Sequence, residues 1–195
     1  MRHGRMKVLP ALRSTPTRWG GLARFFHWIV ALLIAIQALI GLYMVGLPLS
    51  VAKLKIYLLH KSIGMTILAL VLLRLAWRAY DPHPQRPGGM SLWQWRGARL
   101  VHVTLYFLLL ALPLSGWVYN SASGFPLPWF GMLQLPAIAP VSASLAAVAL
   151  LAHRAAFIAL FTVLMVHIWA ALDHHWRLDD DVLRRMLPFS KRGAK

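Results

Sequence analysis

Nine histidines occur in this 195-residue sequence, and five of them lie in or at the edge of long apolar stretches. These five are His27, His60, His102, His153 and His167. One histidine in a membrane helix is often a hydrogen-bonded contact with another helix, but an ionisable side chain at that depth is a functional candidate by default. Five of them make a purely structural role hard to sustain. Because imidazole is a common ligand of metal ions and of haem iron, ligation is the chemistry to consider first.

Two of these histidines stand fourteen residues apart in the segment HRAAFIALFTVLMVH, from His153 to His167. At ~100° and ~1.5 Å per helical residue, this spacing leaves the two rings about 40° apart around the helix and ~21 Å apart along it. Both rings can therefore face the interior of a helix bundle. One helix can give one ligand to each of two stacked cofactors.

Haem b is the cofactor that takes two axial imidazoles, needs no cysteine and suits an apolar helix bundle. The sequence has no cysteine, which excludes disulfides, thiolate catalysis, iron–sulfur ligation and covalent haem attachment. Zinc would need four close ligands of Cys, His, Asp or Glu, and a proton-relay transporter would usually add membrane carboxylates. The apolar stretches contain no carboxylate. We therefore expect two haems b.

Four apolar blocks must position these side chains. They cover residues 24–45, 56–77, 100–119 and 150–172, each close to the ~20 residues that cross ~30 Å of hydrocarbon. All four must be helical, because lipid offers the backbone no other hydrogen-bond partner. Charged residues make up 13% of the chain, against ~25% in a soluble domain. The expected fold is an all-α, integral membrane four-helix bundle with two haems b stacked across the bilayer.

The basic residues are divided unequally between the two sides of the membrane. Of the 21 Lys and Arg residues, 17 lie on one side, namely in the N-terminal arm and at the start of the first block, from the end of the second block to the start of the third, or in the tail. The positive-inside rule then places both termini in the cytoplasm. This also explains the net charge of +16 without nucleic acid as a partner. We expect a basic cytoplasmic arm (1–23), a transmembrane cytochrome domain (24–176) whose first helix is not cleaved, and a cytoplasmic tail (177–195).

The direction of each helix sets the depth of its histidine. Positions seven or eight residues from mid-span lie roughly 10–12 Å from the midplane. His60 and His153 then form an outer layer, and His27, His102 and His167 form an inner layer. Depth alone pairs His60 with His153. It leaves open whether His27 or His102 is the partner of His167.

The flanks of the spans carry further candidates. Arg24 and Arg99 near the inner layer, and Lys61 and Arg154 near the outer one, could pair with haem propionates or be ordinary flanking cations. Gly64, one turn from His60, allows close approach of a ring or of another helix. The connection at residues 120–142 is expected along the membrane interface, and the tail is expected to form one short surface helix.

Several segments together resemble the bacterial cytochrome b561 family, which is related to the cytochrome b subunits of hydrogenases and formate dehydrogenases. They are RFFHWIVALL, LLHKSIGMTILALVLLRLAWR, LVHVTLYFLLLALPLSGW, and AHRAAFIALFTVLMVHIWAALDHHW followed by DDDVLRRMLP. The resemblance covers nearly the whole chain after about Trp19. It implies four membrane helices and two haems b, with His27 and His167 on the cytoplasmic-side haem and His60 and His153 on the periplasmic-side haem. His102 then supports the haem or a bound quinone.

The resemblance also implies a function. Irons with both axial positions filled bind no substrate, so the expected chemistry is outer-sphere electron transfer with ubiquinone as acceptor. One branch of the family resembles a superoxide oxidase, which makes superoxide:ubiquinone oxidoreductase the preferred activity. A cationic patch of Lys53, Lys55, Lys61 and Arg154 would attract the superoxide anion, or would only anchor the protein at the interface. The alternatives are an electron-transfer subunit for a dehydrogenase, hydrogenase or c-type cytochrome partner, and a haem-free membrane scaffold or transporter.

Overall fold

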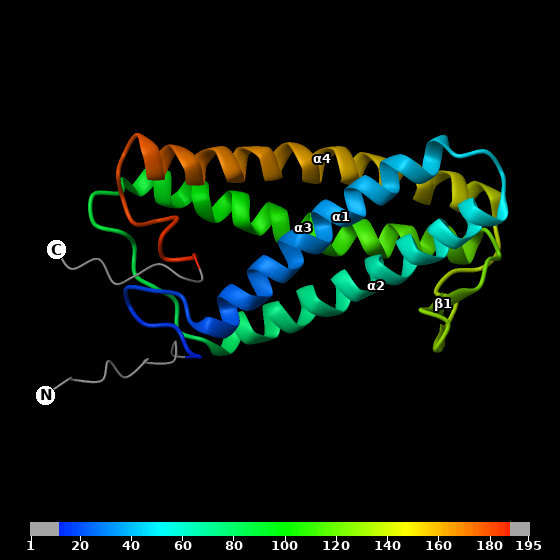
Figure 1. The fold of residues 1–195 in the computed structure, drawn as a ribbon, viewed down its shortest axis with the longest axis horizontal. Helices are drawn as coiled ribbons and strands as arrows, with labels where there is room; N and C mark the ends of the chain where they lie inside the picture. The colour runs from blue at the N-terminus through cyan, green and yellow to red at the C-terminus, as the bar shows by residue number, and fades with distance from the viewer. Residues whose placement is uncertain (1–11, 188–195) are drawn as a thin grey trace, which may run out of the picture.

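The structure is a computed structural model that describes residues 12–187. Within that range four α-helices dominate: α1 (Gly21–Gly46), α2 (Val51–Tyr80), α3 (Leu92–Ala122) and α4 (Ala143–Trp176). Each helix is long and apolar enough to cross a membrane. Helix α3 lies along α4, α1 lies along α2, and α2 also packs on α3 (Figure 1). The predicted all-α membrane bundle is confirmed.

All four helices extend beyond the predicted spans at both ends. Part of the reason is that serine side chains cap the N-termini of α2, α3 and α4. Ser142 Oγ accepts a hydrogen bond from the N–H of Leu145 (3.3 Å), so α4 begins at Ala143 rather than at residue 150. Ser91 and Gln94 form a capping box at the start of α3. Such caps satisfy the N–H groups that the first turn of a helix leaves without partners, and hydropathy alone does not detect them.

A small apolar core lies midway between the two histidine layers. Leu160 is seven residues from both His153 and His167, which places it at the middle of the bundle. The buried members of this core are Val30, Ile67, Val71, Leu108, Leu109 and Leu160. About half of the other large apolar side chains of the helices are exposed, as expected where lipid is the solvent. The core therefore separates the two layers that carry polar side chains.

The predicted interfacial connection, residues 120–142, contains a hairpin that the sequence analysis did not predict. Its strands are β1 (Leu127–Trp129) and β2 (Leu133–Leu135), which pair antiparallel. The turn between them has positive φ at Phe130 (49°) and Gly131 (74°). Three residues lie between the strands, and the N–H of Met132 donates to the carbonyl of Trp129 (3.0 Å). A β-turn with positive φ at both central residues matches the right-handed twist of the strands that it joins.

Hydrogen bonds fasten the hairpin to the part of α2 that follows His60. The indole N–H of Trp129 donates to the hydroxyl oxygen of Thr66 (3.1 Å). The backbone N–H of Phe130 donates to the hydroxyl of Ser62 (3.0 Å). Ser62 and Thr66 are one turn apart and follow His60 in sequence, so the hairpin covers α2 directly after its histidine.

The predicted surface helix of the tail is wrong for the part of the tail that the structure describes. Turns follow α4, because the run of aspartates after Leu178 forms local hydrogen bonds that compete with a helix. One of these joins the N–H of Val182 to Asp180 Oδ1 (3.0 Å). The tail returns to α1, where the Leu187 carbonyl accepts a hydrogen bond from Arg24 (2.9 Å).

Some of the basic residues that were counted on the cytoplasmic side lie outside the described residues. They are Arg2, Arg5, Lys7, Lys191, Arg192 and Lys195.

Candidate cofactor site

The outer layer brings His60 of α2 opposite His153 of α4. Their ring centroids are 6.3 Å apart and their planes are inclined by 74°. Nδ1 of His153 lies 2.9 Å from the carbonyl oxygen of Leu112, so in a neutral imidazole this nitrogen carries the proton and donates. A contact of this kind orients the ring and leaves Nε2 as the ligand atom. Nδ1 of His60 is buried without a hydrogen-bond partner among the residues described.

Glycines on the neighbouring helices lie against both outer rings. A Cβ added at Gly41 of α1 would lie 3.2 Å from Cε1 of His60. A Cβ added at Gly116 of α3 would lie 3.1 Å from Cε1 and 3.2 Å from Nδ1 of His153. A side chain larger than glycine at either position would therefore be tightly packed against the ring unless the ring moved.

Gly64, which was predicted to allow close approach of a ring or of another helix, lies against the side chain of Gln37 on α1. A Cβ at Gly64 would be 3.4 Å from Nε2 of Gln37. That amide donates to the backbone carbonyl of His60 (2.6 Å). The structure thus places Gly64 where it makes room for a hydrogen bond between α1 and α2, next to the segment that carries the outer histidine.

The inner layer gathers three histidines and two residues that the sequence analysis did not single out. The ring centroids of His27 and His167 are 6.2 Å apart, and those of His102 and His167 are 5.3 Å apart. The side chain of His102 is exposed. Nη2 of Arg74 donates to Nδ1 of His27 (3.1 Å). The guanidinium of Arg74 lies 5.3 Å from the ring centre of Tyr106, which suits a cation–π contact.

A signal for Arg74 was present in the sequence. Arg74 follows His60 by fourteen residues, the same spacing that separates His153 from His167. On a helix this places it about 40° from His60 and ~21 Å deeper, which is the depth of the inner layer. The charge count used Arg74 only as a basic residue of the cytoplasmic side and did not use its place on nearly the same face of the helix as His60.

The two inner cations proposed from the sequence differ in burial. Arg24 is buried, with 6% of its surface exposed, and its Nη1 donates to the carbonyl of Leu187 (2.9 Å). Arg24 therefore ties α1 to the tail. Arg99 is exposed near the start of α3.

The four outer cations fall into two groups. The ammonium of Lys53 donates to a backbone carbonyl in the connection between α1 and α2 (2.6 Å). The ammonium of Lys61 donates to the carbonyl of Pro126 (3.5 Å). Lys55 and Arg154 are exposed. The positive charge of the outer end is therefore presented most openly by Lys55 and Arg154.

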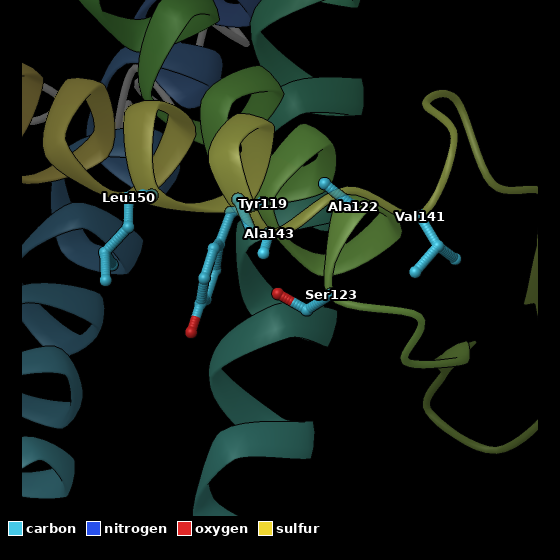
Figure 2. A pocket seen from close by; sticks show the side chains of 8 residues that line it. Tyr119, Ala122, Ser123, Val141, Ala143 and Leu150 are labelled. Atoms are coloured by element: carbon cyan, nitrogen blue, oxygen red, sulfur yellow. The ribbon is translucent and has the colours of Figure 1, made fainter.

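A hollow of about 420 Å³ lies between the outer ends of α3 and α4 (Figure 2). None of the site residues predicted from the sequence lines it, although Leu150 precedes His153 by one turn. Two hydroxyl groups, of Tyr119 and Ser123, interrupt a wall that is otherwise apolar. The wall consists of Tyr119, Ala122, Ser123, Val141, Ala143, Ala146, Ala147 and Leu150.

The spacing of the facing rings fits a metal centre held between two imidazoles. A bond from zinc to an imidazole nitrogen is ~2.0–2.1 Å long. Two such bonds in line, together with the distance from each nitrogen to the centre of its ring, place the ring centroids about 6 Å apart. The pairs His60–His153 (6.3 Å) and His27–His167 (6.2 Å) match this value. Neither α1 nor α2 packs closely against α4. Within residues 12–187, no three His, Cys, Asp or Glu side chains gather around one possible metal position, and a facing pair of imidazoles is a ligand set that haem iron accepts.

Comparison with known proteins agrees with this arrangement. The model of a family described as prokaryotic cytochrome b561 matches residues 18–189. Cytochrome b561 homolog 2 of Escherichia coli (strain K12) is 33% identical over 175 residues, which cover 89% of this chain and 93% of the relative. Cytochrome b561 homolog 1 of the same strain is 30% identical over 171 residues, 86% of this chain and 95% of the relative. A probable superoxide oxidase of Yersinia pestis is 29% identical over 170 residues, 86% of this chain and 93% of the relative.

A match over nearly the whole length, together with four spanning helices and paired intramembrane histidines, identifies the kind of protein. The family implies haem b as the cofactor, and the site residues fit that group. The chain therefore belongs to the prokaryotic cytochrome b561 family and is a multi-pass membrane protein of electron transfer.

Proposed function

We propose that the chain holds two haems b, one in each histidine layer. His60 and His153 are the axial ligands in the outer layer, and His27 and His167 are those in the inner layer. The matched centroid separations of 6.3 Å and 6.2 Å support this assignment. His102 then stands beside the inner haem and supports the haem or a bound quinone.

The protein's own groups prepare both sites. The Leu112 carbonyl fixes the ring of His153, and such outer partners typically contribute 10–100-fold to metal affinity or activity. The central apolar core excludes water between the layers. Bound haem b supplies a one-electron couple. With two imidazoles holding each haem, substrates would exchange electrons with it without binding to the iron.

We infer that the protein transfers electrons from a donor at the outer face to membrane ubiquinone, and that superoxide is the donor. Two superoxide anions each lose one electron and become dioxygen, and one quinone takes up two electrons and two protons to become the quinol. The observation that carries this function is the presence of two imidazole pairs at two depths of one bundle. The relative named as a probable superoxide oxidase and the exposed outer cations favour superoxide as the donor.

Orientation belongs to the same proposal. The flanking cations concentrate at the end that carries the N-terminal arm, residues 81–91 and the tail, so this end faces the cytoplasm and the hairpin faces the periplasm. The chain then lies in the bacterial inner membrane with both termini inside, and lipid is its surrounding solvent.

The direct test mixes the oxidised, purified protein with a superoxide source and a ubiquinone analogue. We expect fast haem reduction that added superoxide dismutase abolishes, followed by quinol formation. Slow reduction by superoxide, combined with fast reduction by a dehydrogenase or a reduced c-type cytochrome, would instead make the chain an electron-transfer subunit. Purified protein without any reduced-minus-oxidised haem signal would contradict the whole proposal.

Removing the exposed outer charges should slow the reduction of the haems by superoxide but not by other reductants. In the double variant Lys55→Gln, Arg154→Gln we expect the second-order rate of haem reduction by superoxide to fall about tenfold at low salt, because clustered charge raises encounter rates by roughly 10–10³-fold. The difference should shrink as salt is raised. Reduction by dithionite and the variant Arg96→Gln, an exposed cation of the opposite end, serve as controls. An unchanged rate would remove these cations from the function.

A single methyl group at Gly116 should disturb the outer site. The added Cβ would lie 3.1 Å from the ring of His153, which the Leu112 carbonyl holds in place, and overpacking of this kind costs ~1–3 kcal/mol. We therefore expect Gly116→Ala to weaken binding of the outer haem about tenfold, since each tenfold is ~1.4 kcal/mol. Haem titration followed by absorbance measures it. Gly97→Ala is the matched control, because it adds the same methyl to α3 where no heavy atom lies within 4 Å.

A further inference from the structure

Arg74 is a cation in a membrane-spanning helix that has no carboxylate partner. The five acidic residues of the chain are all aspartates outside the predicted spans. No ion pair to Arg74 is formed within the described part of the chain. Intramembrane charges of this kind are costly, and they normally pair with an opposite charge or mark a functional site. An anion is therefore missing from the surroundings of Arg74.

The hydrogen bond between Arg74 and His27 is incompatible with ligation by His27. A guanidinium is always a donor, so Nδ1 of His27 must offer its lone pair to Nη2 of Arg74 (3.1 Å). In a neutral imidazole this puts the proton on Nε2, which then has no lone pair for a metal. If Nε2 ligates, the proton moves to Nδ1 and the acceptor is lost; if Nδ1 ligates, its lone pair is used. Arg74 must leave His27 in the haem-loaded protein.

The position of Arg74 defines the anion that it can meet. Its fourteen-residue offset from His60 brings it to the depth of the inner layer, and the ring of Tyr106 lies against its guanidinium (5.3 Å). Haem carries two carboxylates, and bidentate pairing with a carboxylate is the strongest interaction open to a guanidinium. The long side chain can also turn toward the membrane edge.

We propose that Arg74 exchanges partners when haem binds: it releases His27 and pairs with a propionate of the inner haem. This assignment rests on the proposed function, which places that haem between His27 and His167. It adds a binding residue on α2 to a site whose two ligands come from α1 and α4. Arg74 thereby becomes the propionate-binding residue of the inner layer, a role for which the sequence suggested Arg24 and Arg99.

The test compares haem b with its dimethyl ester, in which both carboxylates are neutral. Each is titrated into haem-depleted full-length protein in detergent, for the natural chain and for Arg74→Gln. With haem b we expect the natural chain to bind two equivalents tightly, and Arg74→Gln to bind the second on the order of tenfold more weakly, as loss of a charged hydrogen bond predicts. With the dimethyl ester the two proteins should bind alike. Arg74→Lys, which keeps the charge, should recover part of the affinity for haem b.

Each other outcome contradicts the proposal. Equal weakening of Arg74→Gln toward haem b and toward its ester would make Arg74 a structural residue. Equal binding of haem b by all three proteins would show that no propionate meets it. Arg96→Gln, which removes a cation from the same end of the bundle, should bind both compounds like the natural chain. A natural chain that binds one haem alone would overturn the two-haem function and this inference together, whereas failure of Arg74 alone leaves two haems in place.

Discussion

Replacing His60 by alanine should remove one of the two haems and leave the other. The change deletes one axial ligand of the outer site, and the ring space against Gly41 is left as a cavity. Losing an outer-shell partner of a ligand already costs 10–100-fold, so losing the ligand itself should cost more. We expect the haem b content to fall from about two to about one per chain. Pyridine haemochrome analysis of protein purified in detergent measures it.

Two further variants separate ligation from folding. His60→Met can still ligate, since haem iron accepts a Met/His pair, so it should retain more haem than His60→Ala and show a raised reduction potential. His83→Ala removes an exposed histidine of the loop at residues 81–91 and should keep both haems. Retention of both haems by His60→Ala would remove His60 from the ligand set. Loss of both would assign it a structural role.

The sequence predicted the features that follow from the geometry of a single helix. Hydropathy specified four spans, because lipid permits only helices of a fixed length. The fourteen-residue spacing placed His153 and His167 at two depths from helix geometry alone. The hairpin was missed because its strands have three residues each, too short for a period to be read, and its turn puts Phe130, an unusual residue for positive φ, in the left-handed region.

Features that depend on where side chains point between helices could not be read from one sequence. Depth assigned Arg74 to the cytoplasmic side, but only the packing of α2 against α1 brings its guanidinium to His27. The sequence alone does not distinguish Gly64 from Gly41, yet Gly64 faces Gln37 and Gly41 faces the His60 ring. Helix rotation decides such contacts, and rotation is set by tertiary packing. For the same reason, the sequence alone could not decide whether His27 or His102 is the partner of His167.

That open choice gives the second large prediction. We expect His27→Ala to remove the inner haem and His102→Ala to retain it. The His27–His167 separation of 6.2 Å equals that of the outer pair within 0.1 Å, whereas His102 and His167 are 5.3 Å apart, too close for a metal ion bonded in line to both rings. The haem content per chain and the low-spin signals in electron paramagnetic resonance measure the result.

The reverse pattern would transfer the ligand role to His102 and would leave the hydrogen bond between Arg74 and His27 undisturbed by haem. The two inner proposals are therefore linked, and their variants should agree. If His27 ligates, Arg74→Gln weakens the inner haem through its propionate, and His102→Ala changes quinone reduction or the inner potential while both haems stay. If His102 ligates, His27→Ala keeps both haems and Arg74 has no need to leave its histidine. The fate of one intramembrane hydrogen bond thus separates the two possible ligand sets of the inner site.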